Sequence, residues 1–155
     1  MKMYTCCVFG HRTINETEEL KEKLIEIIKK LITEEKVNVF LFGSKSRFNS
    51  LCLEIVTKMK EEYPHIKRVY VRAEYPYIND QYKSYLLESY DDTYYPEKII
   101  NSGRASYVER NFEMIDNSRF CIVYYDEQRA QAIRKSGTWI ALDHAIKQRK
   151  IIIRV

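Results

Sequence analysis

The sequence predicts a Rossmann-like α/β fold, with a parallel five-stranded sheet, helices on both faces and a Tyr-rich insert. Three observations lead to this fold class. Five short apolar runs are typical of buried strands, and segments with helical spacing of their apolar residues separate most of these runs. The runs are apolar nearly throughout, which is typical of parallel strands that are covered on both sides.

The first half of the chain contains three predicted strands and two predicted helices. Residues 3–9 and 37–42 are β-rich, largely apolar runs, and a glycine follows each of them. Between them, residues 16–35 place leucine and isoleucine at helical spacing. Apolar residues recur at the same spacing over residues 46–63, and residues 66–71 form the third predicted strand.

The second half contains two more predicted strands and the Tyr-rich insert. Residues 74–97 are rich in tyrosine and show no clear period, so we interpret them as an elaboration of the same domain. A helix that begins at Gly103 or Ser106 precedes the apolar run 120–125. A further helix, which begins at Ser136, precedes a last apolar run at the end of the sequence.

Length and composition fit one globular domain and exclude several classes of protein. The chain has 155 residues, of which 45% are hydrophobic and 31% charged, so it is neither disordered nor collagen-like. No apolar run approaches the ~20 residues that cross a bilayer, and no signal-peptide pattern is present, so we expect a cytoplasmic protein. The net charge of +4 is too small to indicate nucleic-acid binding by itself.

The cysteines Cys6, Cys7, Cys52 and Cys121 lack the spacing of a zinc site and the density of a disulfide framework. They fall in strand-like or helix-like runs, so we expect buried free thiols that act as small hydrophobic residues. The sequence indicates no bound metal and no cofactor.

The predicted ligand site lies where strands end and helices begin. Gly10 and Gly43 directly follow the first two strands, and Gly137 lies at the start of the last helix. In parallel sheets, ligands bind beyond the carboxyl ends of the strands, where the strand order reverses. If the first strand neighbours the run 120–125, two short segments face each other across a crevice. The residues of this predicted pocket are Gly10, His11, Arg12, Ser136, Gly137 and Thr138.

The segment at the start of the last predicted helix suits an anion. Ser136, Gly137 and Thr138 offer backbone N–H groups, two hydroxyls and the positive end of the helix dipole, for which phosphate is a natural ligand. The same residue types are also ordinary helix caps, so the tripeptide by itself supports both interpretations equally.

Polar residues after the first two strands extend this site. Arg12 can bind phosphate through its guanidinium fork, and His11 can form a hydrogen bond with a phosphate or a base. The alternative is a surface loop with solvated polar residues, but we favour the ligand role, because strand ends in this fold are the expected place for ligand groups. Gly43 and Ser44 indicate the same role more weakly. Neither a GxGxxG pattern nor a Walker lysine loop is present, which argues against dinucleotide dehydrogenases and P-loop ATPases.

Two carboxylates are candidates for catalysis, Glu109 in the helix before the run 120–125 and Asp143 in the last helix. Either can also be a solvated helix residue, and exposed helix carboxylates are far more common than catalytic ones. No nucleophile, base and orienting group occur at a fixed spacing to support a catalytic role. The residues alone give no independent indication of an enzyme.

Four blocks of the sequence resemble the SLOG superfamily, and most closely its small bacterial YpsA-like branch. The blocks are TCCVFGHR (5–12), LFGSKSRF (41–48), YVERNFEMIDNSRFCIVYYD (107–126) and SGTWIALDHA (136–145). The resemblance covers most of the chain except the insert, and it implies a Rossmann-like fold that binds nucleotides or nucleotide-derived molecules. Related members include Lonely Guy type phosphoribohydrolases, the DNA-processing protein DprA and anti-phage sensor domains that recognise ADP-ribose-like signals.

The resemblance also implies roles for individual residues. In the relatives, a glycine-rich turn with a GT pair contacts phosphate, which corresponds here to Ser136, Gly137 and Thr138. Arg110, followed by Asn111, matches the arginine that precedes the fourth strand. Hydrolytic members carry glutamates directly after the GT pair, whereas this sequence continues with WIA. The acid expected to act at a glycosidic bond is therefore missing from that position.

One function is expected, and one alternative stays open. We expect residues 1–155 to form a single domain that binds an ADP-ribose-like molecule or a mononucleotide, as a sensor or sequestering protein. The alternative is an N-glycosidic hydrolase or transferase that acts on a nucleoside monophosphate through Glu109 or Asp143. We expect a homo-oligomer that binds neither DNA nor membranes. The tyrosines of the insert fit a base-stacking surface or a subunit interface, and we favour the interface.

Overall fold

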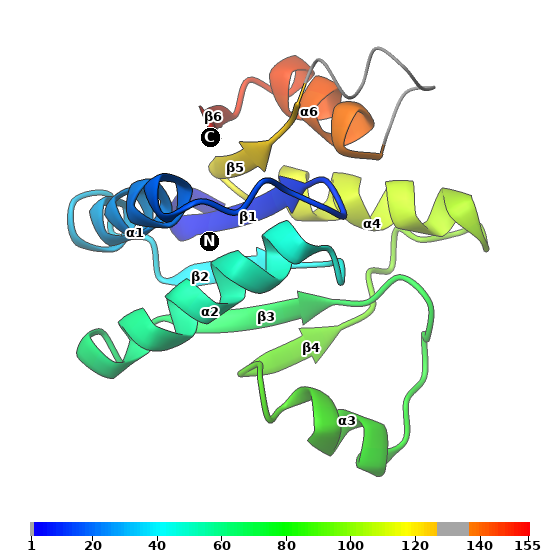
Figure 1. Cartoon of the computed structure of the whole chain (residues 1–155). Coiled ribbons are helices and arrows are strands. Elements are labelled where there is room, and N and C mark those ends of the chain that lie inside the picture. Colours follow the sequence, from blue (N-terminus) through cyan, green and yellow to red (C-terminus); the bar gives the residue numbers. More distant parts are fainter. Residues whose placement is uncertain (1, 127–136) are drawn as a thin grey trace.

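A computed structural model describes residues 2–126 and 137–155 and is built around one parallel sheet (Figure 1). The strands are β1 (Thr5–Gly10), β2 (Val39–Phe42), β3 (Lys67–Val71), β4 (Asp92–Tyr94), β5 (Phe120–Tyr124) and β6 (Ile151–Arg154). The helices are η1 (Lys2–Tyr4), α1 (Glu18–Thr33), α2 (Arg47–Glu62), α3 (Asp80–Leu86), α4 (Arg104–Asp116) and α6 (Gly137–Lys147). The predicted α/β class with a parallel sheet is confirmed.

The sheet has six strands, so the predicted number of five is wrong. The additional strand is β4, which lies inside the Tyr-rich insert and pairs with β3 in parallel. It is three residues long and buries only Thr93, whose hydroxyl donates to the carbonyl oxygen of Tyr70 at 2.7 Å. β4 contains no apolar run from which a strand could be predicted. It is a strand because it pairs with β3.

The strand order is β4-β3-β2-β1-β5-β6. The chain adds β2, β3 and β4 on one side of β1 and then β5 and β6 on the other, so the strand order reverses between β1 and β5 while all strands stay parallel. The expectation that the first strand neighbours the run 120–125 is confirmed, since β1 pairs with β5 from Cys6↔Phe120 to Gly10↔Tyr124. The carboxyl ends of all six strands therefore lie at one edge of the sheet, with the reversal at its centre (Figure 1).

Helices cover both faces of the sheet, as predicted. The first core joins α1 and α2 to one face, where Leu24, Ile28 and Phe48 are fully buried. The second core joins α4 and α6 to the other face, around Met114. The helical spacing seen in residues 16–35 arises from this burial, although α1 begins at Glu18, where the Thr17 hydroxyl caps the backbone N–H of Leu20 at 3.1 Å.

All four cysteines are buried free thiols, as predicted. Cys7 and Cys121 occupy paired positions in β1 and β5, with their sulfur atoms 3.4 Å apart. Burial raises the pKa of the Cys7 thiol well above its ordinary value, so it acts as a small apolar residue. Within the described part of the chain, no helix has the length and apolar character needed to cross a membrane.

Candidate functional site

A cavity of about 760 Å³ opens at the carboxyl ends of β1, β2 and β3. This is the edge at which parallel sheets bind ligands. The structure brings together at this cavity the predicted residues Gly10, His11, Arg12, Gly43, Ser44, Arg110, Asn111, Gly137 and Thr138. Ser136 lies outside the described residues. The binding role of these residues stays a prediction.

Two glycines allow helices from opposite faces of the sheet to reach the cavity. A Cβ atom on Gly10 would lie 2.4 Å from the side chain of Phe48, which is fully buried in α2. A Cβ atom on Gly43 would lie 2.6 Å from the Met114 sulfur and 2.8 Å from the Arg110 side chain, both in α4. The absent side chains at the two strand ends are therefore what permits this close packing.

The connection from β2 to α2 is held by a dense set of short-range hydrogen bonds. The hydroxyl of Ser46 caps α2 by accepting from the backbone N–H of Asn49 at 3.2 Å. The Asn49 side chain accepts in turn from the backbone N–H of Gly43 at 3.4 Å, and the Ser44 and Ser46 hydroxyls lie 3.0 Å apart. These contacts give the loop that lines the cavity a fixed conformation.

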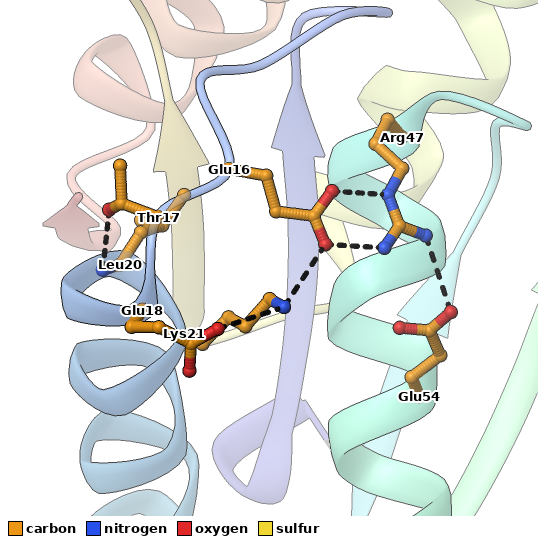
Figure 2. Close-up of polar contacts among 7 residues, drawn as sticks. All are labelled: Glu16, Thr17, Glu18, Leu20, Lys21, Arg47 and Glu54. Atoms are coloured by element: carbon orange, nitrogen blue, oxygen red, sulfur yellow. Dashed lines mark hydrogen bonds and ion pairs between the residues drawn. The ribbon is translucent and has the colours of Figure 1, made fainter.

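An ion pair ties the β1–α1 connection to the start of α2, as Figure 2 shows. The Arg47 guanidinium donates to both oxygens of Glu16, at 2.8 and 2.5 Å, and also to Glu54 at 3.2 Å. The hydrogen bonds from Arg47 lower the pKa of the Glu16 carboxyl. In addition, the backbone N–H of Arg47 donates to the carbonyl oxygen of Arg12 at 2.9 Å. The loop that carries Arg12 is thereby fixed next to α2.

His11 joins the loops that follow β1 and β5. It is 9% exposed, and its Nε2 accepts a hydrogen bond from the backbone N–H of Asp126 at 2.9 Å. Its ring lies 5.5 Å from the ring of Tyr125 and meets Tyr124 edge-on. This contact occupies Nε2 within the protein, so His11 holds the wall of the cavity at the strand-order reversal, and its predicted contact with a ligand stays a prediction.

Arg110 places a buried positive charge at the cavity. The side chain is 5% exposed, and its guanidinium donates to the carbonyl oxygen of Gly43 and, at 2.9 Å, to Asn111 Oδ1. Within residues 2–126 and 137–155, no carboxylate pairs with it. Burial lowers the pKa of Arg110 to about 10, which still leaves it charged at neutral pH. The negative charge of Glu74 acts on Arg110 across the cavity and partly opposes this lowering, but it forms no ion pair with the guanidinium. A buried cation that lacks a directly bound carboxylate favours a negatively charged ligand.

Other groups extend this basic end of the cavity, which comprises Arg12, Lys45, Arg110 and the start of α6. Arg12 and Lys45 are exposed, and neither forms an ion pair with a described residue. Helix α6 begins at the cavity with Gly137, and the next residue, Thr138, is 9% exposed. The first turn of a helix carries partial positive charge, so these groups together suit an anion.

The aromatic wall of the cavity consists of Tyr70, Tyr75, Tyr82 and Tyr107. The sequence left a base-stacking surface open for the tyrosines of the insert, which include Tyr75 and Tyr82, but it did not single out Tyr70 or Tyr107. The rings of Tyr75 and Tyr82 meet edge-on, with centroids 5.7 Å apart. The Tyr107 ring lies 5.5 Å from the guanidinium carbon of Arg110. Tyr70 could have been predicted, because it lies near the end of the third predicted strand, which ends at the same edge of the sheet as the first two.

The other tyrosines of the insert have different environments. Tyr90 packs against Tyr70 and Phe42, with ring centroids 5.1 and 6.1 Å away, and burial raises its pKa. Tyr77 and Tyr85 are 93% and 66% exposed. Only some of the insert's tyrosines therefore face the cavity, and a subunit interface through the exposed ones stays a prediction.

Neither predicted catalytic carboxylate lines the cavity. Glu109 accepts from the side-chain and backbone nitrogens of Asn101, at 2.5 and 3.2 Å, and these bonds lower its pKa. Asp143 pairs with Lys147 one turn along α6, at 2.8 Å. Among the described residues, the carboxylate that lines the cavity is Glu74, which sequence reasoning did not single out. No group of side chains in this part of the chain is suited to hold a metal ion.

Comparison with known proteins identifies the family. The family model described as the YspA SLOG family (YpsA) matches residues 1–149. This range contains all four blocks that resemble the family and every residue named above as lining the cavity. A comparison with curated proteins gives no match. Because the family match covers nearly the whole chain, this protein belongs to the YpsA branch of the SLOG superfamily.

Proposed function

We propose that this protein binds an anionic nucleotide or nucleotide-derived molecule in the cavity and releases it unchanged, as a sensor or sequestering protein. The observation that carries the proposal is Arg110, a buried cation at the cavity that forms no ion pair with a described carboxylate. A bound phosphate would supply the missing negative charge and accept hydrogen bonds from the guanidinium fork. Membership of the SLOG superfamily supports a nucleotide-related role.

The two kinds of surface in the cavity match the two parts of a nucleotide. The basic end suits phosphate groups, since it combines arginine and lysine side chains with the start of α6. The aromatic wall suits a planar base, because tyrosine rings offer flat apolar faces for stacking. A volume of about 760 Å³ lies within the range of small-molecule sites.

Titration calorimetry with AMP, GMP, ADP-ribose and NAD tests the proposal. We expect at least one of these compounds to bind with a stoichiometry of one per chain. Arg110→Met should weaken that binding by about 100-fold or more, because it removes two charge-assisted hydrogen bonds in a buried site. Arg119→Met is the matched control, since Arg119 is an exposed arginine outside the cavity.

Recovery of the bound compound separates binding from turnover. After long incubation with the protein, chromatography should return the nucleotide intact. Release of free base would contradict the proposal and favour an N-glycosidic enzyme instead. Absence of binding by every compound, or equal binding by Arg110→Met, would also overturn it.

A further inference from the structure

Glu74 has an unusual position for a carboxylate in an anion-binding cavity. It lies just beyond β3, is exposed, and lines the cavity. Its Oε1 accepts a hydrogen bond from the hydroxyl of Tyr107. Within the described residues, its other oxygen makes no hydrogen bond and no cation pairs with it. A carboxylate held in place through one oxygen therefore presents a vacant acceptor to the cavity.

The arrangement gives the cavity an inner end that is basic and an outer end that carries charges of both signs, Glu74 and Arg72. Arg110 is 5% exposed, whereas Tyr107 is 38% exposed and Glu74 lies beyond its hydroxyl. Tyr107 connects the two, because the centre of its ring lies 5.5 Å from the Arg110 guanidinium carbon and its hydroxyl donates to Glu74. Phosphate is attracted to the inner end, whereas at the outer end the charge of Glu74 offsets that of Arg72, which donates to the carbonyl oxygen of Tyr75 and the hydroxyl of Thr93. The neutral part of a nucleotide is therefore expected at Glu74.

The surroundings of Glu74 suit a planar ring with hydrogen-bond donors along its edge. Tyr75 follows Glu74 directly, and its ring meets that of Tyr82 at the same wall. A carboxylate matches best an edge that carries two adjacent donors. Guanine has such an edge in its N1–H and N2 amino group. Adenine and cytosine place an acceptor beside their amino group, and uracil has a single N–H between two carbonyls, so each would bring a lone pair toward the carboxylate.

We propose that Glu74 makes the cavity selective for guanine nucleotides. This inference rests on the proposed function, because it assumes that the phosphate lies at Arg110. Tyr107 is a positioning residue, since its hydroxyl holds the carboxylate at the aromatic wall. The base lies against the tyrosines, and its N1–H and amino group donate to Glu74.

Calorimetric titration of GMP, IMP and AMP tests the selectivity in graded steps. The three share the ribose and the phosphate, and their bases present two donors, one donor and a mismatched edge to a carboxylate. We expect GMP to bind about tenfold tighter than AMP or better, with IMP between them. Glu74→Gln keeps the shape but adds a donor, so it should reduce the GMP to AMP ratio to about one. Glu88→Gln, an exposed glutamate outside the cavity, should keep the wild-type ratio.

Each other outcome has a definite meaning. AMP binding as tightly as GMP, or a ratio that persists in Glu74→Gln, would overturn the selectivity and leave the proposed function intact. A loss of GMP affinity on removal of the 2′-hydroxyl, equal to the loss in Glu74→Gln, would overturn it as well, because Glu74 would then contact the ribose. Failure of all three nucleotides to bind would contradict the proposed function itself. Circular dichroism of each variant verifies that it is folded.

Discussion

The inner and outer ends of the cavity are built in different ways. The inner end rests on β1, β2 and the starts of α2 and α6, and close packing at Gly10 and Gly43 leaves no room for another side chain. The outer end comes from the Tyr-rich insert and from Tyr107, whose side chains are exposed or half-buried. The fold therefore fixes the inner end, where we propose that the anion binds, whereas residues at the outer end can change without disturbing the core.

The strongest test of this comparison is a glycine substitution at the inner end. In Gly10→Ala, the new methyl group would overlap the Cβ of Phe48, which cannot move because the ring is fully buried. We expect the free energy of unfolding to fall by about 2–3 kcal/mol, as in other overpacked cores. Urea denaturation followed by circular dichroism measures this loss.

Gly137→Ala is the matched control, because among the described residues outside its own helical turn no atom lies within 4 Å of the added Cβ. Its effect on the free energy of unfolding should stay within about 1 kcal/mol, the difference between glycine and alanine in a helix. Equal effects at the two positions would show that the close packing of β1 against α2 is not needed for the fold.

A substitution at the outer end should affect binding more than stability. Tyr82→Ala removes a ring that lines the cavity and is half-buried. We expect the affinity for the bound nucleotide to fall by about tenfold, the usual loss for one stacked base. The melting temperature should change little. Tyr85→Ala removes a neighbouring ring outside the cavity and should leave the affinity unchanged, so an equal loss in both variants would contradict the assigned wall.

The ion pair beside the inner end predicts a pH dependence of stability. Hydrogen bonds from Arg47 lower the pKa of Glu16 from its ordinary value of 4.5. The ionised carboxylate therefore stabilises the fold above that value, and this contribution is lost as the pH falls through the lowered pKa. Between about pH 5 and pH 3, the wild type should lose more stability than Glu16→Gln.

Glu18→Gln provides the control for this pH effect. Glu18 is 85% exposed and pairs only loosely with Lys21, at 3.5 Å. Its removal should leave the acid-induced loss of stability as in the wild type, measured by thermal melts across the same pH range. An equal change in both variants would mean that the Arg47 contact does not stabilise the connection from β1 to α1.

The smallest effect is expected at Asp143, which lies outside both ends of the cavity. Asp143→Asn breaks an exposed ion pair with Lys147 and should cost about 0.3–0.5 kcal/mol of stability. Nucleotide affinity should be unchanged in calorimetry. A large loss of affinity would show that this part of α6 reaches the ligand, and it would extend the inner end of the cavity beyond Thr138.

The parts of the molecule that were predictable from sequence are those with a local pattern. β1 and β2 each show an apolar run that ends at a glycine, and α1 shows helical spacing of its apolar residues. The local sequence alone therefore predicts that these elements form and which of their residues are buried. β4 has no such pattern, because its order comes from pairing with β3. For a segment of three residues, contacts with the rest of the fold determine whether it forms a strand, and intrinsic strand propensity contributes little.

The residues of the candidate site also divide into those that the sequence predicted and those that it did not. Gly10 and Gly43 were found from their positions after strands, and Arg110 from its resemblance to the family. Glu74 was not found, because its contact with Tyr107 joins residues that are far apart in sequence. A carboxylate in a loop carries no local signal of the partner that orients it, so only the folded chain identifies it.

The central position of β1 has a consequence for synthesis of the chain. β2 follows β1 closely in the chain and is synthesised early, but the other partner of β1, β5, begins only at Phe120. Until then, a nascent chain exposes one edge of an apolar strand, which is a template for association with other chains. We therefore expect translation that stalls after β4 to yield an aggregation-prone intermediate, and chaperones to bind the chain during that interval.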